Sequence, residues 1–128
     1  MNTHRAEHIL SQKETLKELV VSTATQAFFA HGIKNVKMDD IAQQLKISKR
    51  TLYQLFADKE ELLVCCIEHT TQQRQEELHR LCLQCDNVLE IILYDFKKKF
   101  DYLKQTSSSF LEELARYPRV LQKMEETR

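Results

Sequence analysis

Residues 38–63, MDDIAQQLKISKRTLYQLFADKEELL, decide the fold of this 128-residue chain. The stretch predicts two short helices joined by a tight turn, at residues 38–45 and 49–55, followed at once by the start of a third helix. The second helix surrounds two apolar anchors, Leu52 and Leu55, with charged and polar side chains. A short helix with so polar an outer surface, placed just after a turn, has the form required for reading the major groove of DNA. We therefore interpret the stretch as a helix-turn-helix.

Polar residues at the expected helix ends support this interpretation. Asp39 and Asp40 lie in the first turn of their helix, where carboxylates interact favourably with the helix dipole. Ser48 is expected to cap the next helix, and Asp58 with Glu61 forms a capping box for the helix that follows.

Upstream, a stripe of apolar and small residues at 3-4 spacing predicts a helix over residues 13–30. The stripe consists of Leu16, Leu19, Val20, Thr23, Ala24, Ala27 and Phe28. Residues 1–11 show little periodicity, so we expect a frayed lead-in there. Gly32 is the only glycine of the chain, and it suits the left-handed position that ends a helix.

Downstream, the pattern predicts a long helix from residue 59 and a further helix over residues 88–105, capped by Asp86 or Asn87. We expect the inner face of the long helix to comprise Leu62, Leu63, Cys66, Ile67, Thr70, Leu78 and Leu81. We expect the next helix to turn these residues toward a core: Ile91, Ile92, Phe96, Phe100 and Leu103.

Two short helices are expected near the C-terminus. Ser109 and Glu112 form a capping box for the first, which should stop near Tyr117 because Pro118 disfavours helical geometry before it. A last helix is expected over residues 120–127. It ends without a stop signal, so we expect the chain to be cut off in mid-structure.

The composition is typical of a mainly helical chain. It is 42% hydrophobic with one Gly and one Pro, whereas sheets and loops would demand more turn residues. No apolar run approaches the roughly 20 residues that cross a bilayer, and the N-terminus has no signal-peptide core. We therefore expect a cytoplasmic protein with no membrane partner, whose four cysteines are free thiols.

The net charge is zero but unevenly distributed. Residues 34–59 hold six Lys or Arg and three Asp, whereas residues 60–128 hold ten basic and thirteen acidic residues. A basic segment on a neutral protein can hold phosphates, although the sequence-independent attraction to nucleic acid would be modest.

The pattern from residue 16 to residue 63 resembles the TetR family of transcriptional regulators. After an apolar first helix, the family's anchor positions recur at fixed spacing as Phe28, Phe29, Gly32, Asp40, Ile41, Ala42, Ile47, Ser48, Thr51, Leu52, Tyr53, Phe56, Lys59, Glu60, Glu61 and Leu62. Any one of these positions alone would be weak evidence. Their number makes the resemblance specific.

The resemblance implies an all-α fold: a three-helix DNA-binding head with a helix-turn-helix at residues 1–57, then a partial helical regulatory domain at residues 58–128. The second domain would bind an effector and pair two chains. The implied function is a transcriptional regulator, a repressor, that binds a palindromic operator in double-stranded DNA as a homodimer. A small-molecule effector would control its DNA affinity, and no cofactor or metal is implied.

Three positions depart from the family pattern. Lys37 stands at the cap of the second helix, where Ser or Thr is usual, so Asp40 or water must satisfy the free amides. Lys46 replaces the turn glycine, at a cost of about 1 kcal/mol if the residue is left-handed. Leu55 occupies a position where an aromatic residue is common.

Resemblance and side-chain chemistry together select seven residues for DNA contact. Four are expected at phosphates: Lys37, Thr51, Tyr53 and Lys59. The other three are expected to read bases: Lys49, Arg50 and Gln54. Hydroxyls and ammonium groups near helix N-termini suit phosphates, whereas Arg pairs with guanine and Gln with adenine. The alternatives are a solvated surface for Lys49 and Arg50, core packing for Tyr53, and plain exposure for Lys37 and Gln54.

Two other groups of side chains invite simpler explanations. Cysteines and histidines recur at helical spacing in residues 65–69 and 79–85, which could serve metal binding or redox sensing, but Cys also fills helix cores as a small hydrophobe. The aromatic residues available to line an effector pocket are Tyr94, Phe96, Phe100, Tyr102, Phe110 and Tyr117. We assign none of them to a ligand.

One rival function comes from another class. A shortened helical interaction protein could pair with a full-length regulator and bind no DNA alone. An enzyme is the least expected, because there is no glycine-rich phosphate loop and no set of nucleophile, base and acid.

Overall fold

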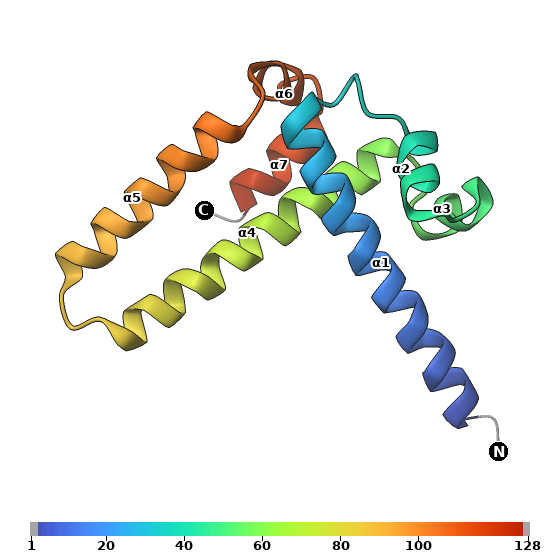
Figure 1. Cartoon of the computed structure of the whole chain (residues 1–128), viewed down its shortest axis with the longest axis horizontal. Helices are drawn as coiled ribbons and strands as arrows, with labels where there is room; N and C mark the ends of the chain where they lie inside the picture. The colour runs from blue at the N-terminus through green and yellow to red at the C-terminus, as the bar shows by residue number, and fades with distance from the viewer. Residues whose placement is uncertain (1–2, 127–128) are drawn as a thin grey trace.

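The computed structural model describes residues 3–126, and within that range the chain forms helices and no strand. The helices are α1 (Thr3–His31), α2 (Met38–Leu45), α3 (Lys49–Leu55), α4 (Lys59–Gln84), α5 (Val88–Gln105), α6 (Ser108–Leu114) and α7 (Pro118–Glu126). In Figure 1, α2 and α3 lie at one end of the molecule, and α4 and α5 form a long hairpin, the arm, that points away from them. The all-α fold expected from the sequence is confirmed.

Helix α1 is longer than its apolar stripe predicts. It begins at Thr3 rather than near residue 13, so the expected frayed lead-in is wrong for residues 3–11. The N-terminal part of α1 extends past the other helices (Figure 1). Once a helix is nucleated, each added residue costs little, and this segment contains no Gly or Pro to stop it. The stripe therefore marks the packed part of α1 and not its beginning.

One hydrophobic core joins the helices. Residues of α1, the α1–α2 loop, α2, α3, α4, α6 and α7 contribute to it. Its largest fully buried side chains are Phe28, Phe56, Ile33, Ile41, Leu52, Leu62, Leu63, Val20, Val120 and Cys66. The expected inner face of α4 is buried only at its N-terminal end, at Leu62, Leu63, Cys66 and Ile67. Leu19 of the α1 stripe is an exception to the prediction, because it is 51% exposed.

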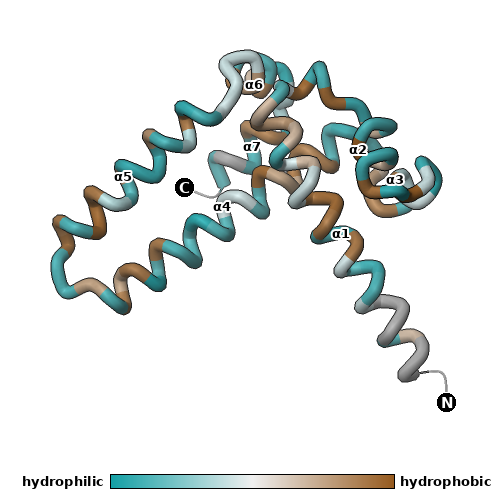
Figure 2. Tube along the Cα trace, viewed as in Figure 1, coloured by the Kyte–Doolittle hydropathy of each residue, from teal (hydrophilic) through white to brown (hydrophobic). Residues whose placement is uncertain are grey.

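The prediction that the apolar residues of α5 face a core is wrong. None of its residues is buried among those described, and Phe96 is 70% exposed, the highest value among the exposed large apolar residues of this helix. In Figure 2, several short brown segments along α5 mark its hydrophobic residues. Six of them, each more than half exposed, make up what we call the α5 face: Leu89, Ile92, Leu93, Phe96, Phe100 and Leu103. Helix α5 contacts α4 through its other side, where Tyr94 donates a hydrogen bond to Glu77 at 2.6 Å.

The ends of α6 and α7 also differ from the prediction. Helix α6 begins at Ser108, after Ser107, so Ser109 is not its cap. The Ser109 hydroxyl instead lies 2.6 Å from that of Ser107. Helix α6 ends at Leu114, and Pro118 opens α7. Proline is favoured at the first helical position because its fixed φ fits and its missing N–H has no partner there.

Candidate DNA-binding interface

The turn between α2 and α3 is built without the usual glycine. Lys46 has φ 57° and ψ 39°, which places it in the left-handed region. Its N–H donates to the carbonyl of Gln43 at 3.2 Å, and the N–H of Ile47 donates to Ala42 at 3.0 Å. This is the Schellman arrangement that closes a helix C-terminus. Lys46 thus adopts the left-handed geometry on which its expected cost was conditional, and these two hydrogen bonds hold it.

Ser48 then starts α3 as predicted. Its hydroxyl oxygen accepts a hydrogen bond from the N–H of Thr51 at 3.1 Å. The Thr51 hydroxyl lies 2.8 Å from the same oxygen, so its hydrogen-bonding capacity is partly used within the cap. In the middle of α3 and directly after its last residue, Leu52 and Phe56 are fully buried. The cap and these two anchors fix which side of α3 faces outward.

The outward side of α3 carries three of the predicted contact residues: Arg50, Tyr53 and Gln54. All three are exposed, and Tyr53 is 47% exposed, so it is not packed in the core. Arg50 and Tyr53 are three positions apart and therefore lie on the same face of the helix. Helix α3 thus presents a guanidinium, a phenol and an amide together to solvent.

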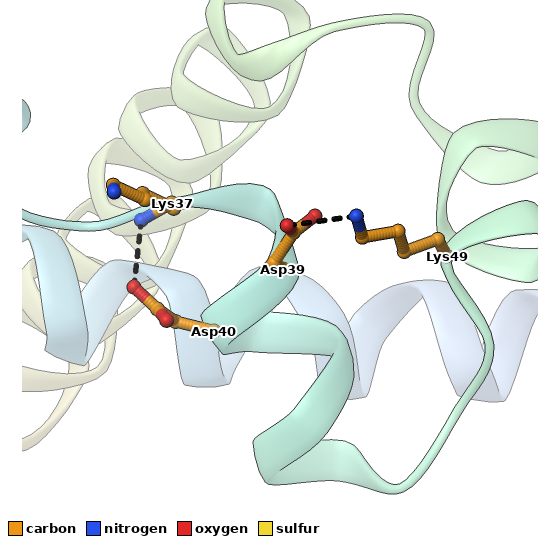
Figure 3. Close-up of polar contacts among 4 residues, drawn as sticks. All are labelled: Lys37, Asp39, Asp40 and Lys49. Atoms are coloured by element: carbon orange, nitrogen blue, oxygen red, sulfur yellow. Dashed lines mark hydrogen bonds and ion pairs between the residues drawn. The ribbon is translucent and has the colours of Figure 1, made fainter.

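The predicted cations at the edges of this surface have carboxylate neighbours. Figure 3 shows Asp39 of α2 pointing at Lys49 of α3, with 2.8 Å between Oδ2 and Nζ. This exposed ion pair raises the pKa of Lys49, first through its hydrogen bond to Asp39. In the same view, the Asp40 carboxylate accepts a hydrogen bond from the backbone N–H of Lys37 at 3.2 Å. Asp40 therefore satisfies the backbone N–H of the cap residue itself, while the Lys37 side chain stays exposed.

Lys59 begins α4, directly after the cap that the sequence predicts. The N–H of Glu61 donates to Asp58 Oδ1 at 2.8 Å, while the Glu61 carboxylate accepts from the N–H of Ala57. Lys59 is only partly exposed, and this burial lowers its pKa, whereas the charges of Glu113 and Asp40 act in the opposite direction. A DNA phosphate at this position would add a further counter-charge to an ammonium that water hydrates incompletely.

Two carboxylates near these cations were not predicted from the sequence. Asp39 was assigned only to the helix dipole, yet it is the partner of Lys49 across the turn. Its spacing of ten residues from Lys49 becomes informative only once the helix-turn-helix is recognised. Glu113 of α6 accepts a hydrogen bond from the backbone N–H of Lys34, which lies 79 positions away. No local pattern could have identified that contact.

The cysteine, histidine and aromatic residues considered for metal or effector binding lie outside α3 and its outward face. Within residues 3–126, no group of three or more His, Cys, Asp or Glu side chains is arranged to hold a metal ion. A hollow of about 310 Å³ lies between α1 and α4, lined by Glu14, Lys17, Glu18, Val21, Cys65, Glu68, His69 and Gln72. None of the six aromatic residues that the sequence offers as possible pocket lining belongs to it.

The capped turn, the buried anchors and the exposed polar face of α3 define a helix-turn-helix DNA-binding module. Residues 20–65 match the family model described as bacterial regulatory proteins, tetR family. Residues 20–65 therefore form a TetR-family N-terminal helix-turn-helix domain. No curated protein and no solved structure matches the chain. In the part that the structure describes, no helix has both the length and the apolar character needed to cross a membrane.

Proposed function

We propose that the protein is a repressor that inserts α3 into the major groove of its operator. The observation that carries this proposal is the outward face of α3, where Arg50, Tyr53 and Gln54 are exposed around a helix anchored by Leu52. Side chains on one exposed face can reach base edges and phosphates at the same time.

The seven side chains divide by chemistry into two sets. The base readers are Lys49, Arg50 and Gln54. The phosphate contacts are Lys37, Thr51, Tyr53 and Lys59. On binding, Lys49 would leave its exposed ion pair with Asp39 and bind acceptors on DNA. Breaking this ion pair costs little stability, because exposed ion pairs contribute little.

The proposal includes a dimer that reads a palindrome. Two recognition helices must lie about one turn of DNA apart, roughly 34–36 Å, or a multiple of that distance. Residues 1–57 would then serve as the DNA-binding head, and residues 58–128 would pair the chains and bind the effector. The core shared by Phe28, Phe110 and Val120 supports coupling between these two parts, because a ligand that repacks one part must disturb the other. We place this activity in the cytoplasm, where the bacterial chromosome is.

The test begins by selecting bound duplexes from a random pool and measuring affinities by fluorescence anisotropy at fixed salt. Arg50→Ala should flatten the preference at one base pair, by about 1–3 kcal/mol. Tyr53→Phe should weaken binding to all duplexes alike, because it removes one phosphate hydrogen bond. Lys97→Ala is the matched control, since it removes one exposed cation from α5 and should leave both affinity and preference unchanged. An Arg50→Ala protein that selects the same sequence with the same preferences would contradict the assignment of Arg50.

A second function is favoured by one observation, the exposed α5 face. A contiguous exposed apolar surface often marks a protein–protein contact. The chain would then pair with another regulator and block it. Light scattering with duplex titration separates the two functions, because a monomer without DNA affinity supports this alternative and excludes the first.

A further inference from the structure

Helix α6 lies across the C-terminal end of α1, and hydrogen bonds link its beginning to α1 and its other end to the α1–α2 loop. At its beginning, the N–H of Ser107 donates to the carbonyl of Phe29 at 2.8 Å. That carbonyl belongs to the last turn of α1, where helix carbonyls have no partner within the helix. Beside it, the Phe29 ring meets Phe110 edge to face, with 4.7 Å between centroids. The start of α6 is thus fixed to α1 by one polar and one aromatic contact.

At its other end, α6 holds the loop that leads into α2. The Glu113 carboxylate accepts a hydrogen bond from the backbone N–H of Lys34, in that loop. Ile33 and Val36 on either side are buried in the core. The loop is therefore held both by its buried side chains and by the hydrogen bond to Glu113. Only three residues separate Lys34 from the first residue of α2.

Gly32 shows how closely α6 approaches this loop. A Cβ at Gly32 would lie 2.6 Å from the Ser109 hydroxyl and 3.1 Å from Glu113 Oε1. Its φ of +87° also excludes most other residues. Glycine is therefore required here both by the backbone and by the neighbouring helix.

Glu113 also lies within electrostatic range of Lys59, at the start of α4. One side chain of α6 therefore binds the loop before α2 and also acts electrostatically on the first residue of α4. Both places hold residues assigned to phosphate contact, since Lys37 is the last residue of that loop.

From these contacts we propose that Glu113 is a positioning residue for DNA binding. Its carboxylate holds the α1–α2 loop through the Lys34 N–H and so sets where Lys37 and α2 stand relative to α4. It does not touch DNA and acts through the backbone that it holds. This proposal rests on the DNA binding proposed above.

Two substitutions separate the effect of the position of the Glu113 acceptor oxygen from the effect of its negative charge. Glu113→Asp keeps the charge but withdraws the acceptor by the length of one C–C bond. Glu113→Gln removes the charge but keeps an acceptor oxygen at the same reach. Glu112→Asp and Glu112→Gln are the matched controls, because Glu112 is the exposed neighbour on the same helix.

If Glu113 acts by position, Glu113→Asp should weaken binding to the selected duplex by roughly fivefold or more, because the loop loses a charge-assisted hydrogen bond. Glu113→Gln should bind as tightly as the wild type or tighter, since a negative charge near phosphates is gone. If charge alone mattered, Glu113→Asp would equal the wild type. Equal affinities of Glu113→Asp and the wild type therefore overturn the proposal.

Hydrogen exchange at the Lys34 amide, measured by NMR without DNA, tests the contact itself. We expect exchange roughly tenfold faster in Glu113→Asp, a smaller increase in Glu113→Gln because a neutral oxygen is a weaker acceptor, and no change in both Glu112 variants. An unchanged Lys34 amide in Glu113→Asp would show that the contact does not hold the loop. A wild-type protein that binds no duplex would overturn the proposed function and the positioning role together. The exchange result would still decide whether the contact exists.

Discussion

At the scale of single residues, the conformation of Lys46 is set by the turn and not by its side chain. The turn needs a left-handed residue so that the N–H of Lys46 and of Ile47 can reach back to the last turn of α2. A residue with a Cβ adopts this conformation at a cost, and glycine does so freely. The backbone of Lys46 is therefore slightly strained, at the turn that sets the direction of α3.

The first prediction follows from that strain. Lys46→Gly should stabilise the protein by about 1 kcal/mol, partly offset by the greater freedom of glycine in the unfolded chain. The unfolding temperature measured by calorimetry should rise by roughly 3 °C. Lys46→Ala is the control, because it removes the same side chain beyond Cβ but keeps the strain. Equal gains from both substitutions would show that the lysine charge, and not the backbone, is responsible.

At the scale of elements, local patterns predicted the helices that have their signals within a few residues. The bounds of α2 and α3 agree with the prediction, because Ser48, Asp58 and the apolar anchors act over one or two turns. The burial of α5 could not be predicted in the same way. Its amphipathic pattern shows that one face is apolar, but only the positions of the other helices decide whether that face is covered.

The candidate site was predictable to a similar extent. The exposed face of α3 follows from helical spacing around Leu52. The partners of its cations do not, because Asp39 meets Lys49 across a turn and Glu113 approaches from a helix late in the chain. Such contacts depend on how the helices pack and not on any local sequence pattern.

The packing of α4 on α1 leads to a prediction about alkaline pH. Cys66 is 1% exposed, and its thiol donates to the carbonyl of Val21 at 3.6 Å. Burial raises the pKa of Cys66 to about 12, from 9.0. Above pH 9 the unfolded chain can ionise this thiol while the folded protein cannot, so its contribution to stability is lost as the pH rises from 9 toward 12.

The free energy of unfolding should therefore fall less steeply above pH 9 in Cys66→Val than in the wild type. The difference should approach, at most, about 1.4 kcal/mol per pH unit. Urea titrations followed by circular dichroism at pH 8, 9 and 10, with a reducing agent present, measure it. Cys82→Val is the control, because Cys82 is exposed. Parallel slopes for the wild type and Cys66→Val would mean that the thiol ionises equally in both states. Burial also raises the pKa of Tyr102, which adds the same dependence to every variant.

At the scale of the whole molecule, the arm leaves the six large apolar side chains of the α5 face more than half exposed. The six residues of the α5 face are spaced so that they form one continuous stripe along the helix. Contiguous apolar patches larger than a few hundred Å² usually mark an interface. Because the proposed function requires two chains on one operator, we expect a second copy of the chain to cover this stripe.

The last prediction is that Phe96→Asp, on the α5 face, converts a dimer into a monomer. Light scattering at tens of micromolar should give twice the mass of one chain for the wild type and a single chain for the variant, because a buried unpaired carboxylate opposes association. Leu19→Asp is the matched control, since Leu19 is a similarly exposed apolar residue on α1. Affinity for a duplex with two half-sites should fall in Phe96→Asp, whereas affinity for one half-site should not, because only the first depends on linking two heads. If Phe96→Asp stays dimeric and binds two half-sites normally, the chains pair through another surface.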